Sequence, residues 1–148
     1  KDVGTDTATP VGVFLGCSYT DPTFGKTFRQ YYASTTNITD IVAYVQDDPD
    51  ALFKVAVVSA TTTIGYVTRA NVGENAVLVQ NTGSTITGNS KVAIDDTTAT
   101  TATFPLRIID VIAETQSAAG SYTEVVVKWN APSSNSVGGH QYLLATGI

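Results

Sequence analysis

The stretch from Val11 to Tyr19 alternates between apolar residues and small or polar ones, and this pattern limits the fold more than any other feature. Its odd positions are apolar, and its even positions include Gly12, Gly16 and Ser18. A period of two with β-branched and aromatic residues predicts a strand with one buried face. Glycine on the opposite face would let another backbone or a ring approach closely. The strand should end before Pro22, because proline cannot donate to a strand ladder.

Further strands are expected along the chain, separated by turns rich in glycine, proline, aspartate and small polar residues. They are predicted at residues 27–32, 41–45, 52–58, 76–79, 91–94, 106–112 and 122–129. Four apolar residues at Ile38, Ile41, Val42 and Val45 also fit a helical stripe. The β-branched character of this segment favours a strand, since such residues pack well on a pleated surface.

Two of the expected strands carry specific predictions. The Asp47–Asp50 turn should join residues 41–45 and 52–58 into a hairpin. The strand at 106–112 has apolar residues at both even and odd positions, which predicts a central strand with two buried faces. Its two expected faces are Leu106, Ile108 and Ile112 on one side, and Ile109 and Val111 on the other. In the last strand, the side chains expected to face inward are Val125, Val127 and Trp129.

Short strands, turn-rich connections and the lack of a convincing helix predict an all-β fold. We expect a single-domain antiparallel β-sandwich or β-barrel with extended terminal segments, since 148 residues suit one domain. Residues 1–10 are predicted to be an N-terminal arm or loop, residues 11–130 the β domain, and residues 131–148 a C-terminal linker and tail.

The charge of the chain excludes some classes of partner. The net charge is -5 and the basic residues are spread singly, which argues against a nucleic-acid partner. No apolar run is long enough to span a bilayer, so no membrane partner is expected. Charged residues make up 14% of the chain, against roughly 25% in ordinary soluble domains. A polar but weakly charged surface suits a protein held in a fixed assembly, where long side chains would lose rotamer entropy.

The sequence predicts no enzyme activity and no cofactor. Cys17 is the sole cysteine, which excludes an intrachain disulfide and a cysteine zinc site. His140 is the sole histidine, which excludes a two-histidine metal site. The Asp47, Asp48 and Asp50 carboxylates could serve calcium, but aspartate and proline are also favoured simply for making turns, and the turn is preferred.

Tyrosines are the remaining candidates for binding. Seven of them could supply a sugar-stacking platform or an assembly interface, because their rings combine apolar area with a polar tip. Tyr31 and Tyr32 would point to opposite faces of a strand, so one of them is a candidate contact residue. The other tyrosines are expected to pack in the core or in cross-strand pairs.

Residues 11–22, 28–32 and 43–55 together resemble a family of small virion structural proteins of tailed bacteriophages. The late segments 105–107, 122–130 and 140–147 fit as well, so the resemblance covers nearly the whole chain in order. Proteins of this kind decorate, or cement, the outside of an assembled capsid, often as symmetric oligomers. The resemblance implies a major capsid protein as partner, a homo-oligomer with a trimer as the first expectation, and a place on the capsid surface after synthesis in the host bacterial cytoplasm.

The resemblance also implies further residues before Lys1 and points to the terminal segments as interaction sites. The interaction candidates are Lys1, Pro10, Tyr31, Tyr32, Asp47, Asp48, Asp50, His140, Tyr142 and Ile148. Two other functions stay open: a carbohydrate-binding or adhesive β module, and a self-polymerising filament subunit.

Overall fold

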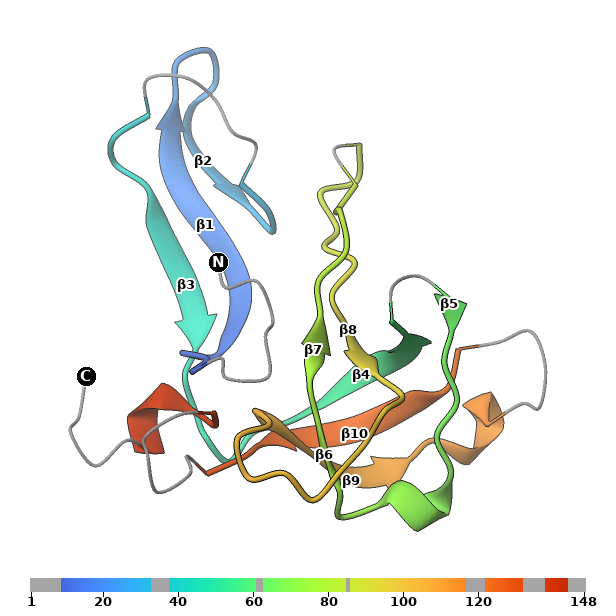
Figure 1. The fold of residues 1–148 in the computed structure, drawn as a ribbon. Helices are drawn as coiled ribbons and strands as arrows, with labels where there is room; N and C mark the ends of the chain where they lie inside the picture. Colours follow the sequence, from blue (N-terminus) through green and yellow to red (C-terminus); the bar gives the residue numbers. More distant parts are fainter. Residues whose placement is uncertain are drawn as a thin grey trace.

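The computed structural model describes residues 9–32, 38–60, 63–84, 86–116, 122–131 and 138–143. These residues form an all-β fold of two sheets, one with three strands and one with seven (Figure 1). The predicted all-β, single-domain sandwich or barrel is therefore confirmed. The described residues contain no α-helix, only three short 3-10 turns. The predicted boundaries near residues 10 and 130 lie just outside the strands, which run from Val13 to Trp129.

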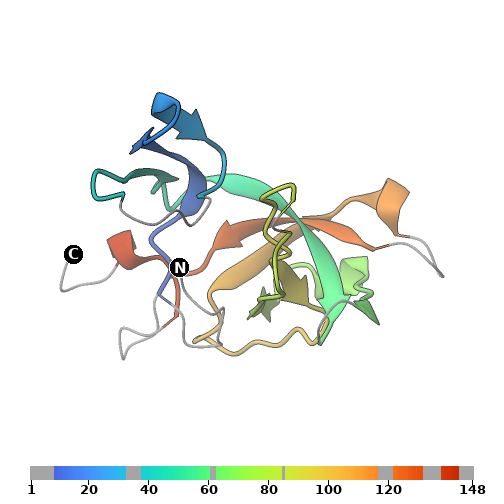
Figure 2. The same ribbon diagram turned by 90° about the horizontal axis from the view of Figure 1, so that it is seen from above.

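The small sheet contains β1 (Val13–Asp21), β2 (Gly25–Arg29) and β3 (Val42–Gln46). Its order is β2-β1-β3, and both pairings are antiparallel. This sheet stands upright beside the larger one in Figure 1 and lies over one side of it when seen from above in Figure 2. The alternating segment that dominates the sequence is thus the central strand of the small sheet.

A bulge in β1 corrects the predicted buried face. Phe14 pairs with Val45 and Gly16 with Tyr44, so one extra residue, Leu15, is accommodated on β1. A bulge shifts the alternation of faces by one position. Odd-numbered residues before the bulge therefore lie on the opposite face from odd-numbered residues after it. Cys17 and Tyr19 are buried as expected, whereas Leu15 is 53% exposed, against expectation.

The large sheet has the order β6-β9-β10-β4-β8-β7, with β5 paired to β4, and it curls into a nearly closed, barrel-like shape. All its pairings are antiparallel except the parallel pair of β4 and β8. Its strands are β4 (Leu52–Ser59), β5 (Thr63–Ile64), β6 (Asn75–Ala76), β7 (Leu78–Val79), β8 (Ala93–Asp95), β9 (Leu106–Val111) and β10 (Glu124–Trp129). The 3-10 turns are η1 (Arg69–Asn71), η2 (Ala113–Thr115) and η3 (Gln141–Leu143).

The core lies inside the curl of the large sheet. Strand β10 confirms its prediction, since Val125, Val127 and Trp129 are buried and the positions between them are only partly buried. They pack with buried residues of the neighbouring strands and loops, namely Val57, Val67, Ala76, Ile94, Leu106, Ile108 and Val111. The apolar area removed from water along this cluster is the main stabilising contribution to the fold.

The two predicted faces of β9 are wrong in one respect. Val126 of β10 pairs with Asp110 and Val127 pairs with Ile108, so Ile109 is an extra residue on β9. This bulge brings Val111 onto the buried face with Leu106 and Ile108, and leaves Ile109 exposed. Strand β9 is central in the sheet order, as predicted, but only one of its faces is buried.

The predicted hairpin of residues 41–45 and 52–58 is also wrong. Both strands exist, but β3 pairs with β1 and β4 pairs with β10, β8 and β5. The turn between them therefore carries the chain from one sheet to the other. Each strand finds a longer partner elsewhere, and the turn chemistry alone could not reveal this.

Candidate interaction surface

The described residues hold no group of three or more histidine, cysteine, aspartate or glutamate side chains that could bind a metal ion. In this part of the chain, none of the helical segments has the length and apolar character needed to cross a lipid bilayer.

One face of the small sheet presents apolar side chains to solvent. The rings of Phe28 on β2 and Tyr44 on β3 lie over β1, with their centroids 5.8 Å apart. They can approach because Gly16 lies beneath Phe28: a Cβ on Gly16 would meet the Phe28 ring at 2.7 Å. The expected role of glycine in this strand is thereby confirmed. Val42 adds a third exposed apolar side chain to the same face. We call Phe28, Val42 and Tyr44 the apolar face.

Polar contacts hold the apolar face in place. The hydroxyl groups of Ser18 and Tyr44 share a 3.2 Å hydrogen bond across the strands. At the upper end of β1, Asp40 accepts hydrogen bonds from the Thr20 hydroxyl at 2.6 Å and from the Thr20 backbone N–H at 3.1 Å. These two bonds lower the pKa of Asp40 below its ordinary value, because they favour the charged carboxylate. The segment before β3 is thus fastened to β1.

Among the described residues, strand β3 forms a free edge of the small sheet. All five of its residues are exposed, and none of them is charged. Natural proteins usually protect an edge strand with charge, proline or a bulge, because unpaired backbone groups attract another strand. The exposed and uncharged edge of β3 therefore leaves backbone groups with which another strand could pair.

The terminal segments predicted to interact meet within the structure. The N–H of Gln141 donates to the carbonyl oxygen of Pro10 at 2.8 Å. His140 is only 1% exposed, with its ring 6.0 Å from that of Trp129, so its side chain lies inside the molecule. Its Nδ1 accepts the N–H of Tyr142 at 3.1 Å, whereas the Tyr142 ring is exposed. The other two candidates here, Lys1 and Ile148, lie outside the described residues.

Tyr31 and Tyr32 lie just beyond the end of β2 rather than within it. The Tyr31 ring rests against Gly88 of the segment between β7 and β8, while the Arg29 guanidinium lies 6.0 Å from the ring centre. Tyr32 packs edge-on against the buried Tyr19, with ring centroids 5.8 Å apart. Cys17 is buried beside them, and its thiol donates a hydrogen bond to the Tyr31 carbonyl oxygen with a sulfur–oxygen distance of 3.7 Å.

The Asp47–Asp50 segment is a turn, as preferred from the sequence. Asp48 accepts the N–H of Asp50 at 2.9 Å through its side chain, and the N–H of Ala51 at 3.2 Å through its carbonyl oxygen. Asp50 pairs with Lys128 on β10 at 2.6 Å. Asp47 and Asp48 are exposed and available to a partner. One of the three carboxylates is thus already paired with a lysine.

Sequence reasoning missed several exposed apolar residues, above all Phe24, Phe28 and Ile86. Phe28 was assigned to a strand, but the strand partner that leaves its ring exposed was not foreseen. Phe24 and Ile86 lie in polar, turn-forming stretches, Thr-Phe-Gly and Thr-Ile-Thr-Gly. A large apolar residue inside a turn sequence is the signal that would have identified both.

No family model, no curated protein and no solved structure matches the chain. The functional assignment therefore depends on the chemistry and geometry of these surfaces and on the sequence resemblance.

Proposed function

We propose that this chain is a virion structural protein that decorates and stabilises the outer surface of a tailed-phage capsid by bridging neighbouring capsomers. The observation that carries the proposal is the small sheet, with its uncharged free edge β3 and its exposed apolar face. Such a sheet offers a broad contact surface. The sequence resemblance to decoration proteins supplies the class of partner, a major capsid protein.

The physical role of such a protein is to add contact area across capsomer boundaries. Each copy makes a modest contact, and many equivalent copies on one shell resist the same expansion together. A self-association into a small closed oligomer, first a trimer, would place several contact surfaces on one particle. The low charge of the chain suits this permanent contact, because few long charged side chains must be ordered.

The test is co-sedimentation of the purified chain with undecorated, expanded phage heads, together with mass photometry of the free chain. We expect a discrete small oligomer that binds the heads to saturation. Val42→Lys places a charge on the apolar face, and we expect it to weaken binding by about tenfold or more. Ile109→Lys is the matched control, since Ile109 is exposed on β9 of the other sheet. A monomer that ignores the heads would contradict the proposal.

A carbohydrate-binding module is the second candidate, and one cavity favours it. A space of about 350 Å³ is lined by Arg29, Gln30, Tyr31, Thr87, Gly88 and Asn89. Amide, hydroxyl and guanidinium groups beside an aromatic ring are the combination that recognises sugar hydroxyls. A glycan array would test this function. Signals that Gln30→Ala and Asn89→Ala both abolish would support it, and an array without signal would exclude it for the glycans present.

A further inference from the structure

One cavity of about 350 Å³ lies between the end of β2 and the segment that joins β7 to β8. Its described lining residues are Arg29, Gln30, Tyr31, Thr87, Gly88 and Asn89. Arg29 is the only charged residue among them, and no carboxylate of a described residue forms an ion pair with its guanidinium. We call this space the Arg29 cavity.

The register of the small sheet explains why Arg29 is half-buried. Arg29 lies opposite Cys17 in the pairing of β1 with β2, on the face where Cys17 and Tyr19 are buried. Lys26 and Phe28 lie on the other face, because side chains alternate along a strand. The guanidinium is therefore partly removed from water, whereas the ammonium group of Lys26 stays exposed.

The Arg29 guanidinium has an aromatic neighbour but no hydrogen-bond acceptor. It lies 6.0 Å from the centre of the Tyr31 ring, and its N–H groups donate to no other described residue. A guanidinium presents its N–H groups as a rigid fork that matches the two oxygens of a carboxylate. A ring face attracts the cation but does not satisfy this fork. Arg29 thus keeps its donors for an anionic ligand in the cavity.

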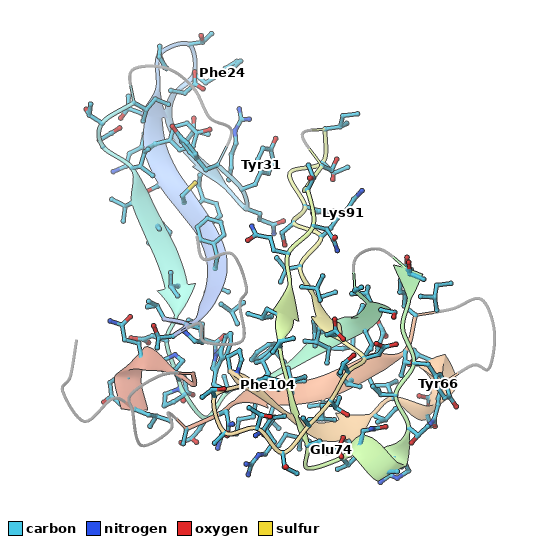
Figure 3. The ribbon with its side chains drawn as sticks, viewed as in Figure 1. Phe24, Tyr31, Tyr66, Glu74, Lys91 and Phe104 are labelled. Atoms are coloured by element: carbon cyan, nitrogen blue, oxygen red, sulfur yellow. The ribbon has the colours of Figure 1, made fainter. Side chains whose placement is uncertain are left out.

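The contact between Tyr31 and Gly88 joins the two sides of the Arg29 cavity. A Cβ on Gly88 would be 2.1 Å from the Tyr31 ring, and the φ of Gly88 is 73°, which disfavours any other residue there. Figure 3 shows Tyr31 directed from the β1–β2 hairpin toward the segment between β7 and β8. Because this contact exists before a ligand binds, little conformational entropy is lost on binding.

The free donors of the Arg29 cavity are side chains and not backbone groups. The N–H groups of Thr87 and Gly88 donate to the Oγ and the carbonyl oxygen of Ser84 at 3.1 and 2.9 Å. The N–H of Asn89 donates to the Thr87 hydroxyl at 3.4 Å. The side-chain amides of Gln30 and Asn89 make no hydrogen bond to another described residue. Phosphate sites usually gather several backbone N–H groups, so this set suits a planar carboxylate better.

We propose that the Arg29 cavity binds an acidic sugar. The guanidinium of Arg29 pairs with the carboxylate of the sugar, and the amides of Gln30 and Asn89 bind its hydroxyl groups. The Tyr31 ring supplies apolar area for the C–H groups of the sugar. The inference rests on the second candidate function, carbohydrate binding, and names its class of ligand. Uronic and sialic acids have this chemistry, because each carries a carboxylate beside ring hydroxyls.

The shape of the Arg29 cavity favours a sugar over an acidic peptide. Peptides are generally bound along a sheet edge or an extended groove. The described lining of this cavity consists of two short segments, residues 29–31 and 87–89, which face each other across a compact space. One sugar ring with its carboxylate can use the guanidinium, the amides and the aromatic ring together.

A glycan array with sialylated, uronic-acid and neutral glycans tests the inference. We expect acidic glycans to bind in preference to neutral ones. The net charge of -5 repels acidic glycans in general, so their binding requires a local cation. Arg29→Gln should weaken this binding by about tenfold or more, because charge-assisted hydrogen bonds are lost. Lys26→Gln is the matched control, since it removes the same charge from the opposite face of β2 and should leave binding unchanged.

Two further measurements examine the carboxylate directly. Asn89→Asp changes an exposed residue, so it does not depend on a substitution at the half-buried Arg29. It adds a negative charge to the cavity at nearly constant shape, and we expect acidic glycans to bind about tenfold more weakly or worse. Calorimetry on the wild-type protein should show a similar loss when the carboxylate of the best acidic glycan is reduced to an alcohol.

Each other outcome would overturn the inference. Equal losses in Arg29→Gln and Lys26→Gln would show general electrostatic attraction, and full binding by Asn89→Asp would place the ligand elsewhere. Displacement of the glycan by polyglutamate or inorganic phosphate at equal concentration would show a peptide or a simple anion as the ligand. Signals from neutral glycans alone would overturn the acidic class and keep the carbohydrate function. An array without signal would overturn both.

Discussion

Strand β2 can pack closely against β1 because Gly16 has no Cβ atom. Its φ is +147°, and a Cβ there would meet the Arg29 carbonyl oxygen and the Phe28 ring, both at 2.7 Å. Gly25, at the turn of the same hairpin, also has a positive φ, but a Cβ there would meet nothing within 4 Å. Comparing an alanine substitution at Gly16 with one at Gly25 therefore distinguishes the energetic cost of a steric clash from that of backbone strain.

We expect Gly16→Ala to lower the free energy of unfolding by about 3 kcal/mol, because strain and overpacking add. Gly25→Ala should cost only about 1 kcal/mol, since strain acts alone there. Urea denaturation of the two variants beside the wild-type protein measures both values. Equal losses would show that the close approach over Gly16 contributes nothing to stability.

Glu74 connects two loops through its carboxylate. It accepts hydrogen bonds from the Thr98 hydroxyl and, at 3.1 Å, from the Asn71 side-chain amide. Both bonds favour the charged form, and they lower the pKa of Glu74 below its ordinary value of 4.5. The stabilisation is therefore fully present above pH 4.5 and is lost as the pH falls through the lower pKa of the folded state.

We expect the urea midpoint of the wild-type protein to fall between about pH 5 and pH 3, and Glu74→Gln to show a shallower fall. Glu114→Gln is the control, because Glu114 is an exposed residue of η2 whose side chain makes no hydrogen bond to another described residue. If the urea midpoint of Glu74→Gln falls with decreasing pH as steeply as that of the wild-type protein, the charged Glu74 carboxylate does not stabilise the fold.

Among the elements, those with a regular alternation were predictable and those with an extra residue were not. Strand β10 alternates without interruption, and each of its inward residues was identified from the sequence. The bulge at Leu15 adds one residue to β1, and the bulge at Ile109 adds one residue to β9. The residue type at these positions does not mark either of them as a bulge. Their position depends on the partner strand, which the sequence of one strand does not contain.

The same limit applies to the candidate surfaces. The Asp47–Asp50 turn and the glycine contact in β1 follow from local chemistry and were predicted. The pairing of β3 with β1 leaves the other side of β3 as the free edge. This pairing depends on whether β3 pairs with the distant β1 or with the following strand, β4, and the sequence of β3 alone does not decide between them. Either Tyr31 or Tyr32 was predicted to be a contact residue, and the Tyr31 ring contacts Gly88 within the molecule.

Strand β10 also offers a test of the core. Val127 is fully buried and Val126, on the opposite face of the strand, is only partly buried. We expect Val127→Ala to lower the free energy of unfolding by about 2 kcal/mol, from lost burial and a residual cavity. Val126→Ala should cost about half as much or less. Chemical denaturation gives both values, and a larger loss for Val126→Ala would reverse the assigned faces.

At the scale of the whole molecule, segments from the beginning and the end of the chain are joined. The Gln141 N–H donates to the Pro10 carbonyl oxygen, and the His140 N–H donates to the Asn130 carbonyl oxygen at 3.0 Å. Gly138 lies so close to Thr103 that a Cβ would be 1.9 Å from the Thr103 carbonyl oxygen. The described residues of the C-terminal segment are thus packed against the fold, where the sequence predicted a linker and tail.

Replacing the donor tests this junction. Gln141→Pro removes the N–H at the first residue of η3, a position that tolerates the proline ring. We expect faster amide hydrogen exchange at residues 11–15 and a loss of about 1 kcal/mol in the free energy of unfolding. Exchange within β10 should stay unchanged. Tyr142→Ala, at an exposed neighbour, is the control, and equal exchange at residues 11–15 in both variants would contradict the role of the bond.

The hydrogen bond between Pro10 and Gln141 also sets how the molecule carries mechanical force. Tension applied to the chain before Pro10 and after Gln141 acts first on this one contact, because the two points are adjacent. The two sheets between these points carry no tension until this hydrogen bond breaks. Force that enters through the apolar face takes a different route, through the ladders of β1 with β2 and with β3. A load on the apolar face and a load applied at Pro10 and Gln141 are therefore borne by separate parts of the protein.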